Sequence, residues 1–69
     1  MKKLTVGENI KRLRLDARLS QAALAKLSET SLLTIFRIEN GKVNPIPATL
    51  KCIADALGIS LDELVKGDK

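Results

Sequence analysis

The sequence predicts an all-α fold, a compact single domain of five short helices. Apolar residues recur at the spacings of three and four that one face of a helix requires, and no run alternates with the period of two that a strand requires. The 69 residues form one small domain, and such a domain buries only about 60% of the surface that its unfolded chain exposes. One cysteine and no histidine exclude an internal disulfide and a four-ligand zinc site, so the fold depends on its apolar core.

The first predicted helix begins after Thr5 and runs to about Arg18. Thr5 is followed three residues later by Glu8, which is the spacing of a capping box. The apolar face of this helix has spacings of four, three and four, at Val6, Ile10, Leu13 and Ala17. The other face is cationic and carries Lys11, Arg12 and Arg18. One side of the helix is therefore expected in the core and the other in solvent.

The second predicted helix follows after a short connection. Ser20 is placed to cap its first turn, and the helix ends near Ser28. Leu24 and Leu27 supply apolar contacts, and the alanines at positions 22, 23 and 25 allow a neighbouring helix to approach closely.

The third predicted helix runs from Leu32 to about Asn40, after a break at residues 29–30. Ser31 can accept hydrogen bonds from the exposed amides of its first turn. Gly41 suits the left-handed residue that ends a helix. Residues 42–47 are then a loop, because they contain two prolines one residue apart.

The fourth predicted helix opens with Pro47 at its first position and closes at Gly58. Ser60 and Glu63 form a second capping box, which starts a short terminal helix. The tail, residues 66–69, is expected to fray. Residues 1–69 are therefore predicted to form a single domain.

Positive charge is concentrated in the first part of the chain. The net charge is +4 and the isoelectric point is about 9.6. Residues 1–20 carry net +4, residues 21–44 net +1 and residues 45–69 net −1. This surplus favours a polyanionic partner. Phe36 is the only aromatic residue, whereas proteins that bind single-stranded nucleic acid stack several bases on aromatic rings, so a duplex is the expected polyanion.

Catalysis is the least favoured class of function. The serines have no histidine to activate them, and the acidic residues form no pair suited to hydrolysis. No catalytic residue, metal ion or cofactor is expected. No segment approaches the roughly 18 apolar residues of a membrane span or the pattern of a signal peptide. Together with the lone Cys52, this favours the reducing cytoplasm.

The specific signal is a motif that extends from Ser20 to Pro45. It consists of Ser-Gln-x-x-Leu-Ala, nine intervening residues, and Ile35-x-x-Ile38-Glu39-x-Gly41-Lys42-x-Asn44-Pro45. The motif resembles the Cro/C1-type, or XRE, helix-turn-helix family, which includes lambdoid phage repressors and small bacterial regulators. The resemblance continues through residues 10–14 ahead of the motif and residues 50–58 behind it. It implies a five-helix, lambda-repressor-like DNA-binding domain with its helix-turn-helix at about residues 20–40.

The resemblance also implies a function. It predicts a sequence-specific double-stranded DNA-binding regulator of transcription, with repression at a palindromic operator as the expected outcome, and with the second helix of the motif in the major groove. No sensor domain fits in the remaining length, so regulation is expected through protein concentration, a partner chain or blocked access of polymerase. The alternative is an antitoxin or adaptor that uses the same scaffold as a protein-interaction module.

Positions that match the family motif supply the candidate contact residues. Base contacts are expected from Gln21, Ser31, Leu32, Leu33 and Arg37. Phosphate contacts are expected from Arg14, Gln21, Asn40, the Gly41 amide, Lys42 and Asn44. The Gln21 amide can bind a phosphate oxygen or an adenine edge, and the Arg37 guanidinium can bind guanine O6 and N7. Arg14 and Glu39 match an ion pair that joins the first helix to the third, and Arg14 would then be aimed at a phosphate.

A symmetric homodimer is a further implication, at least on DNA, with half-sites about one helical turn apart. The dimer surface is expected in the last third of the chain. The candidate residues are Ile46, Pro47, Leu57, Ile59 and Val65. Packing in the core is the alternative explanation for these apolar residues, and it is favoured for Leu57 and Ile59.

The chain departs from the family pattern at two places. Glu29 and Thr30 stand in the turn, where the family has glycine and a β-branched apolar residue, so either Glu29 accepts a left-handed backbone or the turn is rebuilt. Leu32, Leu33 and Phe36 stand where the family mostly has polar residues. Three explanations are open for this apolar patch: contact with thymine methyl groups, burial against a protein partner, or rotation of the helix so that Phe36 joins the core.

Overall fold

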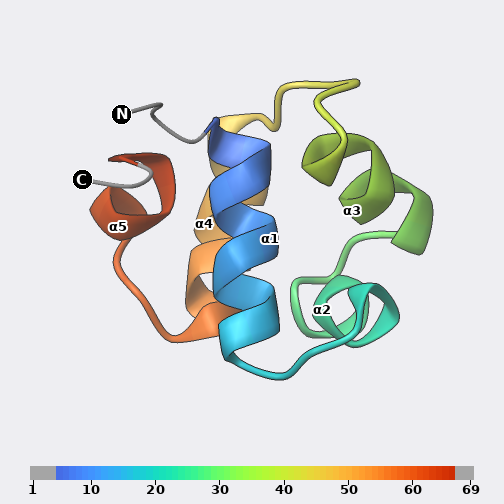
Figure 1. The fold of residues 1–69 in the computed structure, drawn as a ribbon, viewed down its shortest axis with the longest axis horizontal. Coiled ribbons are helices and arrows are strands. Elements are labelled where there is room, and N and C mark those ends of the chain that lie inside the picture. The colour runs from blue at the N-terminus through green and yellow to red at the C-terminus, as the bar shows by residue number, and fades with distance from the viewer. Residues whose placement is uncertain (1–4, 67–69) are drawn as a thin grey trace.

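A computed structural model describes residues 5–66 and contains five helices and no strand in that range (Figure 1). The helices are α1 Val6–Asp16, α2 Gln21–Leu27, α3 Leu32–Glu39, α4 Pro47–Leu57 and α5 Leu61–Lys66. The predicted all-α fold is thereby confirmed. Lys66 ends α5, although we expected it in the frayed tail, and the rest of that tail lies outside the described residues.

The first helix is shorter than predicted. It ends at Asp16 and not near Arg18, because Ala17 is its C-cap and Arg18 has a left-handed backbone with φ of 61°. The Leu19 amide then donates back to the Arg14 carbonyl oxygen over 3.1 Å. This arrangement turns the chain sharply toward α2, and no glycine marks the position in the sequence.

Both predicted capping boxes are present. The Thr5 hydroxyl accepts from the Glu8 amide at 3.1 Å, and the Glu8 carboxylate accepts from the Thr5 amide at 3.0 Å. At the start of α5, the Ser60 hydroxyl accepts from the Glu63 amide at 3.1 Å, and the return bond to the Glu63 carboxylate is 3.5 Å long. Gly58 has the left-handed φ of 70° that closes α4.

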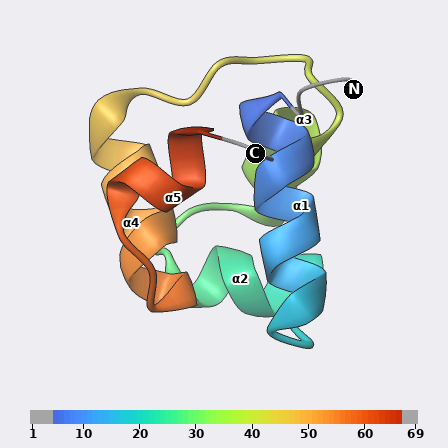
Figure 2. The same cartoon turned by 60° about the vertical axis from the view of Figure 1, so that its left-hand side comes forward.

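A single apolar core draws on every helix. Its fully buried members are Ile10, Leu24, Ile35, Ile38, Ile53 and Leu64, each 0–1% exposed. In the view of Figure 1, α1 and α4 lie between the pair α2–α3 and α5, and Figure 2 shows α5 between α4 and α1. α5 packs against both of these helices. This order separates the helix pair α2–α3 from α5.

Asn9 and Gly7 of α1 determine how α5 and α3 pack against this helix. The buried Asn9 amide donates to the Glu63 and Leu64 carbonyl oxygens at 2.9 and 2.8 Å, which docks α5. Gly7 lies against the end of α3, where an added Cβ would overlap the Ile38 carbonyl oxygen. The position of α3 relative to α1 therefore depends on the absence of a side chain at residue 7.

Candidate nucleic-acid interface

The turn between α2 and α3 places the two helices against each other without the expected glycine. Ser31 caps α3, because its hydroxyl oxygen accepts from the Thr34 amide at 3.0 Å. The buried Ser28 hydroxyl donates to the Leu24 carbonyl oxygen at 2.6 Å and lies 3.2 Å from the Thr30 hydroxyl. Glu29 has φ of 59°. Of the two possibilities for this turn, the structure has the one in which Glu29 adopts the left-handed backbone.

The face of α3 that points away from the core is apolar. Leu32, Leu33 and Phe36 are 52%, 53% and 49% exposed, whereas Ile35 and Ile38 are buried. Burial of Phe36 in the core, one of three explanations for this patch, is therefore wrong. The reason is that Ile35 and Ile38 already fix the rotation of the helix about its axis.

A shallow depression joins the starts of α2 and α3. It is lined by Gln21, Ser31, Leu32, Leu33 and Phe36. Four of the five predicted base contacts are thus brought together here. Arg37, the fifth, is exposed on the last turn of α3 and does not line the depression.

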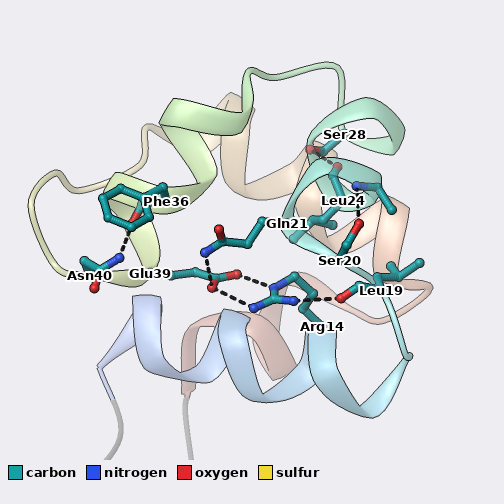
Figure 3. A network of polar contacts seen from close by, with 10 residues as sticks. Arg14, Leu19, Ser20, Gln21, Leu24, Ser28, Phe36, Glu39 and Asn40 are labelled. Carbon is teal, nitrogen blue, oxygen red and sulfur yellow. Dashed lines mark hydrogen bonds and ion pairs between the residues drawn. The ribbon is translucent and has the colours of Figure 1, made fainter.

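A buried polar network supports this surface from behind (Figure 3). The Arg14 Nε donates to Glu39 Oε2 at 2.7 Å, and Nη2 donates to Glu39 Oε1 at 3.1 Å. The third guanidinium nitrogen, Nη1, donates to the Leu19 carbonyl oxygen at 2.7 Å. Only 8% of the Arg14 side chain and 1% of the Glu39 side chain are exposed. The guanidinium is therefore held mainly inside the domain.

Gln21 belongs to the same network, which the sequence motif did not indicate. Its Nε2 donates to Glu39 Oε1 at 3.0 Å. The same oxygen accepts from Arg14, so Glu39 of α3 is hydrogen-bonded to side chains of both α1 and α2. The bond fixes the direction of the Gln21 side chain. Its carbonyl oxygen and its second N–H remain available to a ligand.

The end of α3 closes in a Schellman motif. The Gly41 amide donates to the Ile38 carbonyl oxygen at 3.1 Å, and the Lys42 amide donates to the Arg37 carbonyl oxygen at 2.8 Å. Gly41 has the predicted left-handed φ of 71°. The phosphate contact of the Gly41 amide stays a prediction, and in this structure that N–H donates to the helix.

Other groups in this loop remain accessible. The Lys42 and Asn44 side chains are exposed. Asn40 is exposed too, but one N–H of its amide donates to the Phe36 carbonyl oxygen at 2.8 Å. Within residues 5–66 the backbone amides of Val43 and Asn44 have no hydrogen-bond partner. They are the first free amides after α3. The sequence signal for them is Gly41, because a Schellman motif uses the amides of Gly41 and Lys42 and leaves the next two without a helix partner.

Comparison with known proteins places this arrangement in a family. The sequence model of the family described as Helix-turn-helix matches residues 10–64. The chain belongs to this helix-turn-helix family. The match confirms the resemblance to Cro/C1-type regulators. The family is one of DNA-binding regulators and not a family of enzymes.

Two similar proteins, one of them represented by two solved structures, have related sequences or folds. The Immunity repressor protein of Bacillus phage phi105 is 37% identical over 62 residues, which are 90% of this chain and 43% of that repressor. This helix-turn-helix chain thus spans less than half of that relative. The solution structure of the DNA-binding domain of the P22 c2 repressor is 34% identical, with a TM-score of 0.91 over 99% of this chain and 90% of that one. The crystal structure of the P22 c2 repressor with the synthetic operator 9T is 34% identical, with a TM-score of 0.86 over 94% of this chain and 98% of that one.

The candidate dimer residues of this helix-turn-helix domain fall into two groups. Leu57 and Ile59 are partly buried and pack against the core, as the alternative explanation held. Ile46 and Val65 are 63% and 39% exposed, and Pro47, the first residue of α4, is also exposed. The second group therefore offers the larger exposed surface to a partner.

The described part of the chain was expected to contain neither a metal site nor a membrane-spanning segment. Residues 5–66 contain no group of three or more potential metal ligands. No helix in that range is both long and apolar enough to cross a bilayer.

Proposed function

We propose that this chain is a sequence-specific, double-stranded DNA-binding regulator of transcription, and that it represses from a palindromic operator. The observation that carries the proposal is the uncovered N-terminal half of α3, in a chain that superposes along 94% of its length on a repressor solved with a synthetic operator. An α-helix such as α3 is about 10–12 Å in diameter with its side chains. The major groove of B-DNA is about 12 Å wide and admits such a helix.

The proposed contacts divide by chemistry. Gln21, Ser31, Leu32, Leu33 and Arg37 are proposed to face base edges. Lys42, Asn44 and the second N–H of Asn40 are proposed to bind phosphates, joined by the free amides of Val43 and Asn44. Arg14 would reach a phosphate only through the small exposed part of its side chain, so its main role in this proposal is to hold Glu39 and, through it, Gln21.

Two copies are part of the proposal. The molecule measures 32 × 24 × 22 Å, which is close to one turn of B-DNA, about 34 Å. One chain therefore covers about one turn of the duplex and presents one α3 to one half-site. The second half-site of a palindrome needs a second chain. We propose that Ile46, Pro47 and Val65 contribute to the contact between the two copies. The regulator would act in the cytoplasm, where the DNA that it reads lies, and it would act by binding and not by catalysis.

The test is binding of the full chain to duplex DNA at several salt concentrations, followed by selection from a random duplex pool. We expect affinity to fall steeply with salt, because phosphate contacts release counterions. We also expect the selected sequences to share a two-fold symmetric site. Binding with a flat salt response, or no enrichment in the pool, would contradict the proposal.

A matched pair of charge variants locates the interface. Lys42→Gln is expected to weaken binding to all duplexes alike and to reduce the salt slope by about one. Lys51→Gln removes the same charge from α4, where Lys51 Nζ lies 3.7 Å from Asp55 Oδ2. This control is expected to leave the salt slope nearly unchanged. Equal effects of the two substitutions would show that only net charge matters.

The apolar patch on α3 favours one other function, a protein-interaction module of the antitoxin or adaptor type. Its three members are about half exposed, and an exposed apolar surface also suits a protein partner. Such a module would bind DNA weakly at every salt concentration. The salt titration therefore separates the two functions.

A further inference from the structure

The apolar patch on α3, formed by Leu32, Leu33 and Phe36, has no partner within the domain. Each of its side chains is about half exposed. The helix cannot rotate to bury them, since Ile35 and Ile38 are in the core and Glu39 is bonded to Arg14. The patch is thus a fixed feature of the surface, and it coincides with the part of α3 proposed to enter the major groove.

The surroundings of the patch fit DNA better than an apolar protein surface. Polar Gln21 and Ser31 line the same depression, and no acidic residue lines it. Glu39, at the end of α3, is buried and paired, and exposed Glu29, in the turn before α3, does not line the depression. Arg37 is exposed four residues after Leu33 on α3, so it lies on the same side of the helix, and exposed Lys42 follows in the loop after α3. An apolar surface followed by exposed cationic groups is complementary to a groove flanked by phosphates.

Only one base presents an apolar group in that groove. The major-groove edge of thymine carries a C5-methyl group, whereas the edges of adenine, guanine and cytosine carry donors and acceptors. Leucine and phenylalanine side chains cannot pair with those polar groups, and covering them would leave them without partners. Such a patch is therefore complementary to thymine and not to the other three bases.

We propose that Leu32, Leu33 and Phe36 read the operator through thymine methyl groups, so that each half-site carries thymines opposite the N-terminal half of α3. The inference rests on the proposed DNA-binding function and names the base class that this function recognises. Contact is by burial of methyl groups and not by hydrogen bonds. Burial of one methyl group corresponds to about a fourfold change in affinity.

The test replaces thymine by deoxyuridine, one position at a time, in a half-site selected from the random duplex pool. This replacement removes only the methyl group and keeps every hydrogen-bonding group of the base. We expect about a fourfold loss of affinity at each contacted thymine. Leu33→Ala is expected to bind more weakly than wild type and to lose its sensitivity to deoxyuridine at one position, with an unchanged salt slope.

Leu27→Ala is the matched control, since Leu27 is an exposed leucine, on α2 and outside the patch. It is expected to keep the full sensitivity to deoxyuridine. Circular dichroism checks that each variant retains its helices. Specific binding that is indifferent to deoxyuridine everywhere in the half-site would overturn the methyl contacts and leave the DNA-binding function intact. Absence of salt-dependent binding to any duplex would overturn both, and the patch would then be a protein contact.

Discussion

Glu39 is the residue on which the geometry of the interface depends most. It accepts from Arg14 with both carboxylate oxygens and from Gln21 with one of them, so it joins α1, α2 and α3. Almost none of its surface reaches water. A buried pair of this kind need not add to stability compared with apolar residues, but removal of one partner leaves a charge buried without compensation.

We predict that Glu39→Ala lowers the free energy of unfolding by about 3 kcal/mol or more, because the Arg14 guanidinium loses its counter-charge. The double variant Arg14→Met/Glu39→Met is expected to recover most of that loss. Urea unfolding of both variants checks the prediction. A double variant as unstable as the single one would contradict it.

The same pair of variants separates stability from orientation. In the folded double variant, Gln21 has lost its acceptor, so affinity for the selected operator is expected to fall even though the fold is retained. Arg14→Ala alone is a poor probe of a phosphate contact, since it leaves Glu39 buried and unpaired.

Glu29 is the second residue with a testable energetic role. Its φ of 59° lies in the region where a Cβ is unfavourable. We predict that Glu29→Gly is more stable than Glu29→Ala by about 1 kcal/mol. The alanine variant removes the same charge and keeps the Cβ, so the comparison isolates the backbone. Thermal unfolding of the two variants measures the difference, and equal stabilities would contradict the assignment of strain to this turn.

At the scale of the helices, the sequence predicted each element because the signals are local. Apolar spacing, capping boxes and glycines located all five helices, and only the end of α1 was placed two residues too far along. That error has a physical cause: Arg18 takes a left-handed backbone without being glycine. The interface was predicted less completely, because the amides that remain free depend on how α3 ends and the direction of Gln21 depends on a residue eighteen positions away.

The contact between α1 and α3 is likewise invisible in the sequence. We predict that Gly7→Ala destabilises the domain by about 1 kcal/mol or more, because the added methyl group meets the Ile38 carbonyl oxygen, a backbone atom that cannot move aside. Within an exposed helix, by contrast, alanine is more stable than glycine by about 0.5–1 kcal/mol.

Position 11 is the control, because alanine is expected to be more stable than glycine there and less stable than glycine at position 7. Lys11 is exposed on the same helix, so Lys11→Ala is expected to be more stable than Lys11→Gly. Chemical unfolding of all four chains, wild type included, gives the two comparisons. If alanine were preferred at both positions, the close approach of α1 and α3 would not limit the fold.

At the scale of the whole molecule, the helix pair α2–α3 and helix α5 occupy different sides of the domain, and each packs against α1 and α4. The exposed apolar patch belongs to α3, and in Figure 1 the pair α2–α3 and α5 lie on opposite sides of the molecule. Asn9 docks α5 through two carbonyl oxygens, so α1 contacts both sides. A second copy bound through the proposed contact, Val65 on α5 together with Ile46 and Pro47 at the start of α4, would leave the exposed face of α3 free to enter the groove.

The last prediction tests that separation. Ile46→Gln/Val65→Gln places polar groups on two exposed apolar positions of the proposed dimer contact. We expect the variant to bind a single half-site with unchanged affinity and the full palindrome about tenfold more weakly, with loss of cooperativity, because burying an unpaired amide costs about 1–3 kcal/mol. Leu15→Gln/Leu27→Gln changes two equally exposed leucines outside that contact and is expected to keep cooperative binding. Equal losses on half-site and palindrome would instead place Ile46 and Val65 in the DNA contact or the fold, and not between two copies.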